Sequence, residues 1–307
     1  MIILAALLAA TATPPSSGDI AAAAPALAWR AVAPENLMLM QTGRGTMAIE
    51  LAPDFAPAHV AAIRALVAAG RFDGGAITRV QDNYVVQWAA RPDAATTLTA
   101  SGAAAVAAGS AATPGGVTVG TGPGAAHAAS LPAEYERPAK GLAIMPLGSA
   151  DTYAPSGFWK GWPVATDPKA GTAWLAHCYG SVGVGRDNPP DTGDGSELYA
   201  VIGHGPRHLD RNITLVGRVI DGIEAHSSLP RGTGPLGFYK TPAEQTAITR
   251  VRFASAADPR YEVLDSGSPA FAAYLQARAN RTGFFIRSAQ ATDLCNVQVP
   301  ARRVAAR

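Results

Sequence analysis

The amino-acid sequence predicts a mainly β protein. Its 307 residues include 32 glycines and 24 prolines, which indicates many turns and long connections instead of a helical bundle. Short apolar segments recur along the chain, and the first two flank Thr42–Gly45, whose glycines are typical of a hairpin turn. Hydrophobic residues make up 48% of the chain but aromatic residues only 7%, because alanine supplies much of the total. We therefore interpret the alanine content as a compositional bias and not as evidence for helices.

One segment has a clear helical pattern. Residues 52–70 carry apolar side chains at helical spacing, with Pro57 near the first turn and Gly70 at the end. A hairpin over residues 72–90 follows. Residues 181–195 are rich in glycine and aspartate and are predicted to be a loop. Further strands are expected at residues 140–148, 171–180, 196–203, 213–222 and 247–256, and a helix at 270–279 with one or two short strands after it.

The N-terminal residues 1–18 resemble a secretory signal. They contain an apolar run too short to span a bilayer, followed by Ala10-Thr11-Ala12, which has the small residues of a cleavage site. No lysine or arginine precedes this run, so a misassigned start codon and an uncleaved anchor remain alternatives. We expect export to the periplasm or secretion. Residues 19–34, rich in alanine and proline, are expected to be a linker.

Charge and motif spacing argue against several classes of function. The net charge is +2 and no long basic run occurs, so no nucleic-acid partner is expected. The glycine-rich residues 180–187 lack both nucleotide-binding spacings. His204 and His208 are four residues apart, but the Gly-Pro between them breaks the helix that this type of zinc site needs. No G-x-S-x-G motif of a serine hydrolase occurs. We predict no metal, nucleotide or other cofactor.

The two cysteines, Cys178 and Cys295, allow two interpretations. An even number of cysteines in an exported chain is compatible with one disulfide that joins the middle of the chain to its C-terminal part. Two buried, reduced thiols that pack as small apolar side chains are equally compatible. Neither cysteine has a neighbour at CxxC or zinc-ligand spacing. The sequence leaves the choice open.

The predicted hairpin at residues 72–90 contains a cation and an amide in apolar surroundings. Arg79 lies near the end of the first strand, and Gln87 lies in the second, beyond the polar residues 81–83. Taken alone, such an arginine is expected on an edge strand, with its apolar stem packed and its charged head in water. A functional role for Arg79 is the alternative.

Three blocks of the sequence resemble the cyclophilin family of peptidyl-prolyl isomerases. They are FDGGAITRVQDNYVVQ at residues 72–87, GSELYAVIG at 195–203 and LDRNITLVGRVIDG at 209–222. All three agree with the family in order and spacing, and the resemblance covers residues 36–256.

The resemblance implies a domain organisation. The family fold is a closed barrel of eight antiparallel strands with one helix at each open end, which removes the edges of the sheet. We expect this barrel at residues 35–257, interrupted by a low-complexity insertion at about residues 91–140. Residues 258–307 are expected to form a C-terminal α/β extension packed on the barrel.

The resemblance also implies an active site. Arg79 falls on the catalytic arginine of the family and Gln87 on the glutamine that orients it. WLAHCYG, at residues 174–180, looks like the strand whose alanine and asparagine line the proline pocket. The main-chain N–H of His177 is therefore expected to hold a substrate carbonyl. The substrate-binding residues implied are Tyr84, Val85, Ala176, His177, Glu197, Tyr199, His208, Leu209 and Ile213.

Four of these positions depart from the family pattern. His177 replaces an asparagine and Glu197 replaces a glutamine. His208 stands at an aromatic position, and Ile213 replaces the histidine that closes the far side of the pocket. We expect an apolar pocket with an altered rim, and reduced isomerase activity.

On this interpretation, Arg79 faces a water-filled pocket and donates a hydrogen bond to the prolyl nitrogen of an X-Pro bond. The expected partners are proline-containing segments of exported client proteins, and the chain is expected to be a monomer. The alternative is a cyclophilin-like module that binds such segments, as a chaperone or assembly factor, without accelerating their isomerisation.

Overall fold

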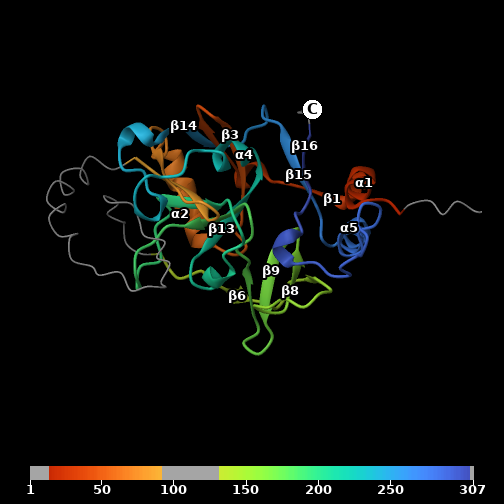
Figure 1. Cartoon of the computed structure of the whole chain (residues 1–307). Helices are drawn as coiled ribbons and strands as arrows, with labels where there is room; N and C mark the ends of the chain where they lie inside the picture. The colour runs from red at the N-terminus through yellow and green to blue at the C-terminus, as the bar shows by residue number, and fades with distance from the viewer. Residues whose placement is uncertain (1–13, 92–130, 305–307) are drawn as a thin grey trace, which may run out of the picture.

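Eight antiparallel strands form a closed barrel in the computed structural model, which describes residues 14–91 and 131–304 (Figure 1). The strands follow one another around the barrel in the order β11, β12, β5, β4, β14, β2, β3 and β13, and β13 pairs with β11. The predicted eight-stranded antiparallel barrel is confirmed. The strands are β2 (Leu37–Thr42), β3 (Gly45–Leu51), β4 (Ala76–Val80), β5 (Val85–Ala89), β11 (Ser181–Val184), β12 (Glu197–Val201), β13 (Leu215–Asp221) and β14 (Thr246–Phe253).

Alternation along the strands fills the barrel with apolar side chains. Met38 and Met40 of β2 lie in the same core cluster as Met47 and Ile49 of β3, and each exposes 1% of its surface or less. Side chains two residues apart share one face of a strand, so this spacing directs all four into the interior. Trp88 of β5, also buried, is the largest side chain of this cluster.

Two helices lie near opposite ends of β3. Helix α2 (Pro57–Ala68) follows the last residue of β3, begins with Pro57 in its first turn and packs Val60 and Ile63 into the barrel core. The short helix α4 (Glu224–Ser227) contacts β3, and its His226 ring lies 3.3 Å from the hydroxyl of Thr42, beside the β2–β3 turn. These helices match the expectation of one helix at each end of the barrel.

A five-stranded antiparallel sheet lies beside the barrel. Its order is β6, β10, β9, β8 and β7. Part of the predicted insertion, residues 131–140, therefore contributes a strand; residues 92–130 lie outside the described residues. The strands are β6 (Arg137–Pro138), β7 (Met145–Pro146), β8 (Ser156–Trp159), β9 (Trp162–Asp167) and β10 (Thr172–Leu175).

One assignment made from the sequence is wrong. A strand was expected at residues 171–180, and β10 lies there, in the five-stranded sheet. Residues 181–195 were expected to be a loop, but the barrel strand β11 begins at Ser181. Its Gly183 pairs with Tyr199, and a Cβ atom at Gly183 would lie only 2.3 Å from the Tyr199 ring. This glycine serves the close approach of an aromatic ring and not a turn.

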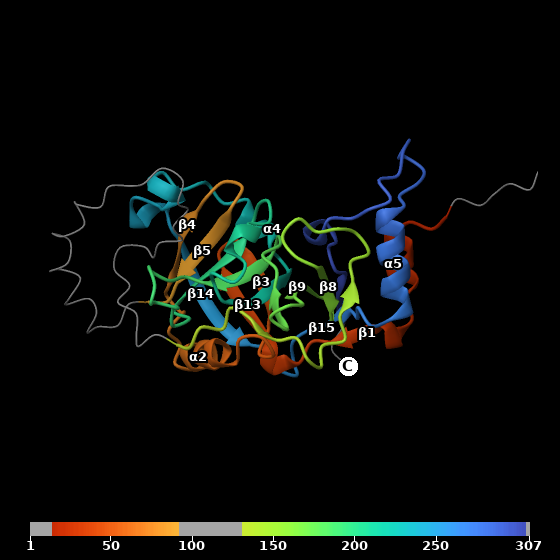
Figure 2. The same ribbon diagram turned by 90° about the horizontal axis from the view of Figure 1, so that it is seen from below.

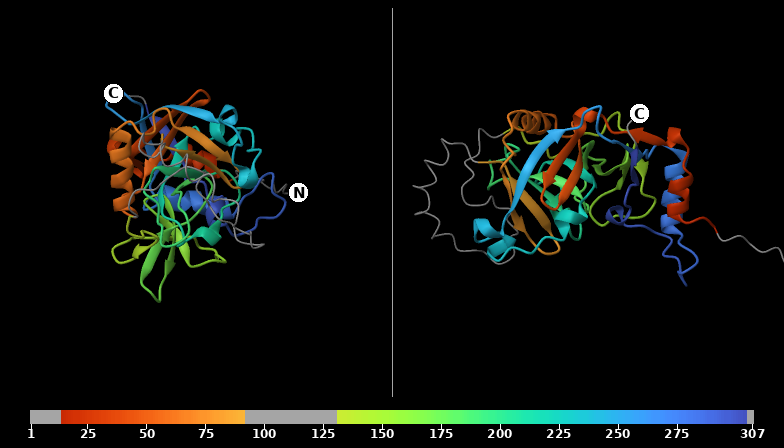
Figure 3. Two further views of the ribbon diagram at one scale, coloured as in Figure 1. Left: turned by 90° about the vertical axis from the view of Figure 1, so that its left-hand side faces the viewer. Right: turned by 90° about the horizontal axis from the view of Figure 1, so that it is seen from above.

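Both ends of the described chain join a second flanking layer. A three-stranded sheet consists of β1 (Trp29–Ala31), β15 (Arg260–Leu264) and β16 (Ala301–Val304). Helix α1 (Ser17–Ala23) packs on α5 (Pro269–Ala279). Both helices lie on the side away from the barrel strands β4 and β5 (Figures 2 and 3). Residues 19–34, expected to be a linker, therefore form ordered structure. A capping box between Ser16 and Asp19 starts α1. None of the described helices is long and apolar enough to cross a bilayer.

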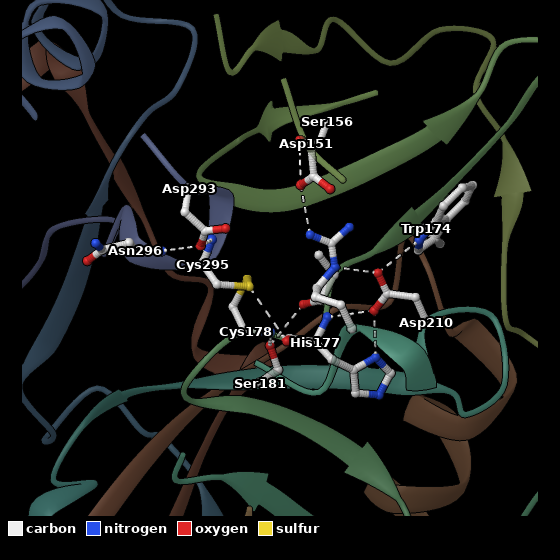
Figure 4. Close-up of a disulfide and its surroundings, with 12 residues drawn as sticks. Asp151, Ser156, Trp174, His177, Cys178, Ser181, Asp210, Asp293, Cys295 and Asn296 are labelled. Atoms are coloured by element: carbon white, nitrogen blue, oxygen red, sulfur yellow. Dashed lines mark hydrogen bonds and ion pairs between the residues drawn. A yellow bond between two sulfur atoms is a disulfide. The ribbon is translucent and has the colours of Figure 1, made fainter. Parts of the chain in front are cut away.

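Covalent and ionic contacts connect these layers to the barrel. Cys178, between β10 and β11, forms a disulfide with Cys295 of the C-terminal segment (Figure 4). Glu50 of the barrel strand β3 accepts hydrogen bonds from Arg30 of β1 at 2.6 Å and from Arg218 of β13 at 2.9 Å. The C-terminal extension thus lies against the barrel.

We predict that loss of the disulfide destabilises the protein. The bond closes a loop of 117 residues, and for such a loop the entropy of the unfolded chain corresponds to about 5 kcal/mol. The double variant Cys178→Ser/Cys295→Ser is therefore expected to melt about 8 °C below the wild type. Differential scanning calorimetry measures the shift, and mass spectrometry of the alkylated, unreduced wild type counts its free thiols. Equal melting temperatures would contradict the prediction.

Candidate active site

Arg79 is completely buried in the barrel wall. Its side chain exposes 0% of its surface, so its charged head does not lie in water and the edge-strand interpretation is wrong. Nε donates to the Leu236 carbonyl at 2.7 Å, one terminal nitrogen donates to Gln87 Oε1 at 3.1 Å, and the other donates to Gln81 Oε1. The water-filled pocket expected around Arg79 is also not found, since protein groups surround the guanidinium.

Two aromatic rings cover the guanidinium of Arg79. Its central carbon lies 5.5 Å from the ring centre of Tyr84 and 5.0 Å from that of Phe238. Burial lowers the pKa of Arg79, while Tyr84 and Glu197 act in the opposite direction. Because the ordinary value is so high, the side chain remains charged at neutral pH.

Sequence reasoning missed the turn that covers Arg79. The turn (Pro235–Gly237) supplies the Leu236 carbonyl, and Phe238 follows directly after it. Leu236 and Gly237 both have positive φ angles, of 56° and 78°. The glycine-rich sequence at residues 231–237 indicated a turn, but no local pattern indicated that the turn would reach Arg79.

Gln87 holds Arg79 from the neighbouring strand β5, and Glu197 of β12 holds Gln87. Gln87 accepts from Arg79 through Oε1 and donates through Nε2 to Glu197 Oε1 at 2.8 Å. Gln87 and Glu197 expose 0% and 1% of their surface. The cation on one side and the carboxylate on the other fix the orientation of the amide. The predicted contact between Gln87 and Arg79 is therefore present, and it extends to Glu197.

An apolar cluster lies next to this network. The ring of Tyr84 belongs both to the cover of Arg79 and to the cluster. Five of the predicted substrate-binding residues are members, and the only further member is Val201. The cluster consists of Tyr84, Val85, Tyr199, Val201, Leu209 and Ile213.

Ala176 and His177 do not have the roles expected of them. Ala176 packs in a different core cluster, beside Cys178. The main-chain N–H of His177 donates to Asp210 Oδ1 at 2.9 Å, so it is not directed toward a substrate carbonyl. Both residues follow β10, which runs in the five-stranded sheet instead of the barrel wall. His208 is exposed, on a short 3-10 turn.

The His177 ring instead contacts the apolar cluster through Tyr199. Its Nδ1 lies 2.9 Å from Asp210 Oδ1 and its Nε2 lies 3.0 Å from the Tyr199 hydroxyl. Asp210 can only accept when ionised, so Nδ1 carries the proton and Nε2 accepts from Tyr199. Burial lowers the pKa of His177, although Asp210 opposes this effect. The ring is therefore neutral at neutral pH.

A buried ionic network continues from Asp210. Besides His177, Asp210 accepts from Arg207 Nε at 2.6 Å and from the Trp174 indole at 3.3 Å, and Arg207 donates to Asp151 Oδ2 at 2.8 Å (Figure 4). Burial raises the pKa of Asp210, but hydrogen bonds from His177 and Arg207 outweigh this effect and hold that pKa below its ordinary value. No sequence pattern links these residues, because the contact between Asp151 and Arg207 is tertiary.

Within the described residues, no group of three or more histidine, cysteine or acidic side chains is placed to hold a metal ion. The groups that the structure brings together at the site are an oriented guanidinium and an apolar cluster.

A closed eight-stranded barrel with an arginine held beside an apolar cluster is the arrangement that the sequence resemblance implied. The family model described as "Cyclophilin type peptidyl-prolyl cis-trans isomerase/CLD" matches residues 37–253 of the chain. The chain belongs to this family of isomerase enzymes.

Individual relatives agree with this family. Proteins of Brucella suis and Brucella abortus named "Probable peptidyl-prolyl cis-trans isomerase" are 43% and 41% identical to the chain over 54 residues. The match spans 18% of this chain and 28% of each relative. The crystal structure of cyclophilin AquaCyp293 from Hirschia baltica has a similar fold, with a TM-score of 0.65 and 24% identity over 91% of this chain and 94% of that chain.

We predict that acid destabilises the protein through His177. The folded state holds the pKa of His177 below the value of about 6.5 expected in the unfolded chain. Below that pH the unfolded chain binds a proton that the folded chain does not, so the free energy of unfolding falls as the pH decreases from 7 to 5. The variant His177→Gln has no titrating side chain at this position, so its free energy of unfolding is expected to depend less on pH.

Urea unfolding at several pH values between 7 and 5 measures this dependence. His226, whose pKa burial also lowers, is present in both proteins and contributes equally to the two slopes. If His177→Gln folds and shows the wild-type slope, His177 is not responsible for the acid sensitivity.

Proposed function

We propose that the protein catalyses cis/trans isomerisation of X-Pro bonds in exported proteins, with Arg79 as the group that stabilises the twisted bond. The observation that supports this most directly is the orientation of Arg79. Its guanidinium donates to Gln87, whose amide is oriented by Glu197, and Tyr84 connects Arg79 to the apolar cluster. No nucleophile, general base or metal ion is required for this reaction.

The chemistry follows from the electronic structure of the amide. An X-Pro bond rotates over a barrier of roughly 18–20 kcal/mol because its nitrogen lone pair is conjugated with the carbonyl. Twisting the bond localises the lone pair on the prolyl nitrogen. A hydrogen-bond donor directed at that nitrogen stabilises the twisted state more than the planar state, which is what lowers the barrier.

Arg79 has donors for this task. A guanidinium carries five N–H groups, and the hydrogen bonds to Leu236, Gln87 and Gln81 use three of them. A further N–H group can donate to a prolyl nitrogen once a substrate is bound. The existing bonds hold the fork in place, so little orientational freedom is lost during the reaction.

A substrate must first reach the buried guanidinium. Gln81, Phe238 and the Leu236 carbonyl lie against it, and Leu236 itself exposes 45% of its surface. This turn is the most exposed part of the cover, so moving it removes the fewest packing contacts. We propose that it moves aside and that the proline ring then packs on Tyr84 and Leu209, where buried apolar surface contributes about 25 cal/mol per Å².

The location of the reaction is also part of the proposal. The Cys178–Cys295 disulfide supports an oxidising compartment, since disulfides persist in the periplasm and outside cells. The signal-like residues 1–18 agree with export. The expected partners are proline-containing segments of other exported proteins, bound by a monomer.

A second candidate function has an observation in its favour. Because Arg79 is fully buried and already bonded to protein groups, the barrel could bind proline-containing segments at its surface without placing the arginine on the prolyl nitrogen. In that case the protein would act as a chaperone or assembly factor.

We predict that Arg79→Ala lowers kcat/KM for an Ala-Pro tetrapeptide by about 10²-fold or more, as loss of one preorganised donor does. Arg79→Lys is expected to restore activity only in part, because an ammonium cannot bond Gln87 and the substrate with the same fork. Since Arg79 is buried, Arg79→Ala also loses about 1–3 kcal/mol of stability. A protease-coupled assay and thermal unfolding measure the two effects.

The matched control is Arg44→Ala, which removes an exposed arginine at the β2–β3 turn and is expected to keep wild-type activity and stability. Folded Arg79→Ala with wild-type activity would exclude the proposed mechanism. A wild type that binds proline peptides but does not isomerise them would favour the binding module.

A further inference from the structure

An apolar tip protrudes from the segment that follows α5. Three consecutive apolar side chains form it, and Phe284 and Ile286 expose 92% and 99% of their surface, with Phe285 at 42%. The segment extends beyond the end of α5, far from the barrel strands β4 and β5 (Figures 2 and 3). Exposed apolar side chains in one contiguous group are characteristic of a contact site.

Arginines surround the base of this tip. Arg278, Arg281 and Arg287 are the only ionisable residues except Tyr274 between Asp265 and Asp293, so the whole segment carries three positive charges and no acidic residue. The guanidinium of Arg281 lies 5.3 Å from the ring centre of Phe285. At least one of these charges therefore lies in direct contact with the apolar side chains.

The three arginines also line one hollow, together with Phe285 and Asp293. Arg278 donates to Asn296 Oδ1 at 3.3 Å and to the Asn296 carbonyl. The single carboxylate of the hollow, Asp293, accepts from the main-chain N–H groups of Cys295 and Asn296, which cap the turn there. The hollow consequently offers mainly cationic donors to a ligand.

We propose that this tip docks the protein on an anionic phospholipid surface. The apolar side chains would enter the interfacial region of the bilayer, and the arginines behind them would contact lipid phosphates. Long arginine side chains suit this arrangement because their stems pack on apolar surface while their heads reach polar groups.

The geometry favours a lipid surface over a protein partner. A stable protein–protein contact buries about 800 Å² on each side, far more than three side chains on a narrow protrusion offer. A bilayer needs no complementary shape, and the basic segment matches its negative surface charge. The tip lies on the layer formed by the chain ends, so docking there leaves the barrel strands β4 and β5 uncovered (Figure 2).

The test is vesicle flotation of the full-length protein with phosphatidylcholine vesicles that contain 0% or 30% phosphatidylglycerol. The wild type is expected to bind the anionic vesicles, with weaker binding at high salt. Phe284→Ser/Ile286→Ser is expected to lower the partition coefficient at least tenfold. Arg281→Gln/Arg287→Gln is expected to lower it about 30-fold at low salt and to weaken the salt dependence, since Arg278 remains.

Matched controls carry the same kinds of substitution elsewhere. Leu27→Ser removes a lone apolar side chain that is 98% exposed, and Arg44→Gln/Arg250→Gln removes two exposed arginines of the barrel. Both are expected to bind like the wild type, and residues 1–13 are present in every variant. All variants are expected to keep the circular dichroism and melting temperature of the wild type, because the substituted side chains are exposed or, at Arg281, only half-buried.

Two results would overturn the proposal. One is a wild type that does not bind anionic vesicles, in which case a protein partner would be the remaining candidate ligand of the tip. The other is vesicle binding that the tip variant and its Leu27→Ser control retain equally, because the apolar side chains would then play no part.

Discussion

The buried charge of Arg79 constrains the barrel around it. A cation inside a protein is tolerated only when it is paired and hydrogen-bonded. Here Gln87 of β5 and the Leu236 carbonyl of the covering turn accept from the guanidinium, and the Glu197 carboxylate of β12 lies beyond Gln87. These hydrogen bonds require the observed register of β4, β5 and β12, because a shift of one residue would turn Gln87 to the opposite face of β5.

A second buried charge, that of Asp210, connects the flanking sheet to the apolar cluster. Asp210 binds Trp174 of β10 and the His177 ring, and His177 in turn holds the Tyr199 hydroxyl. The position of an aromatic ring beside the candidate proline pocket thus depends on residues outside the barrel. The flanking sheet is part of the support of the site and not only an attachment to its surface.

The sequence predicted the parts of the molecule that local patterns determine. Helix α2 and the β4–β5 hairpin follow from periodicity and spacing, and the barrel and the pairing of Arg79 with Gln87 follow from the family resemblance. Strand β11 was missed because Gly183 resembles a turn residue, whereas its real constraint is the Tyr199 ring. The cover of Arg79 and the contact between Asp151 and Arg207 were missed because both are tertiary.

The three-stranded sheet has a consequence for the order in which the chain can fold. Strand β1 leaves the ribosome long before its partner β15, and β16 follows later still. Pairings between such distant segments form slowly, because a long loop must close before the contact is gained. During synthesis, β1 and α1 therefore remain without their native neighbours until β15 and α5 have emerged.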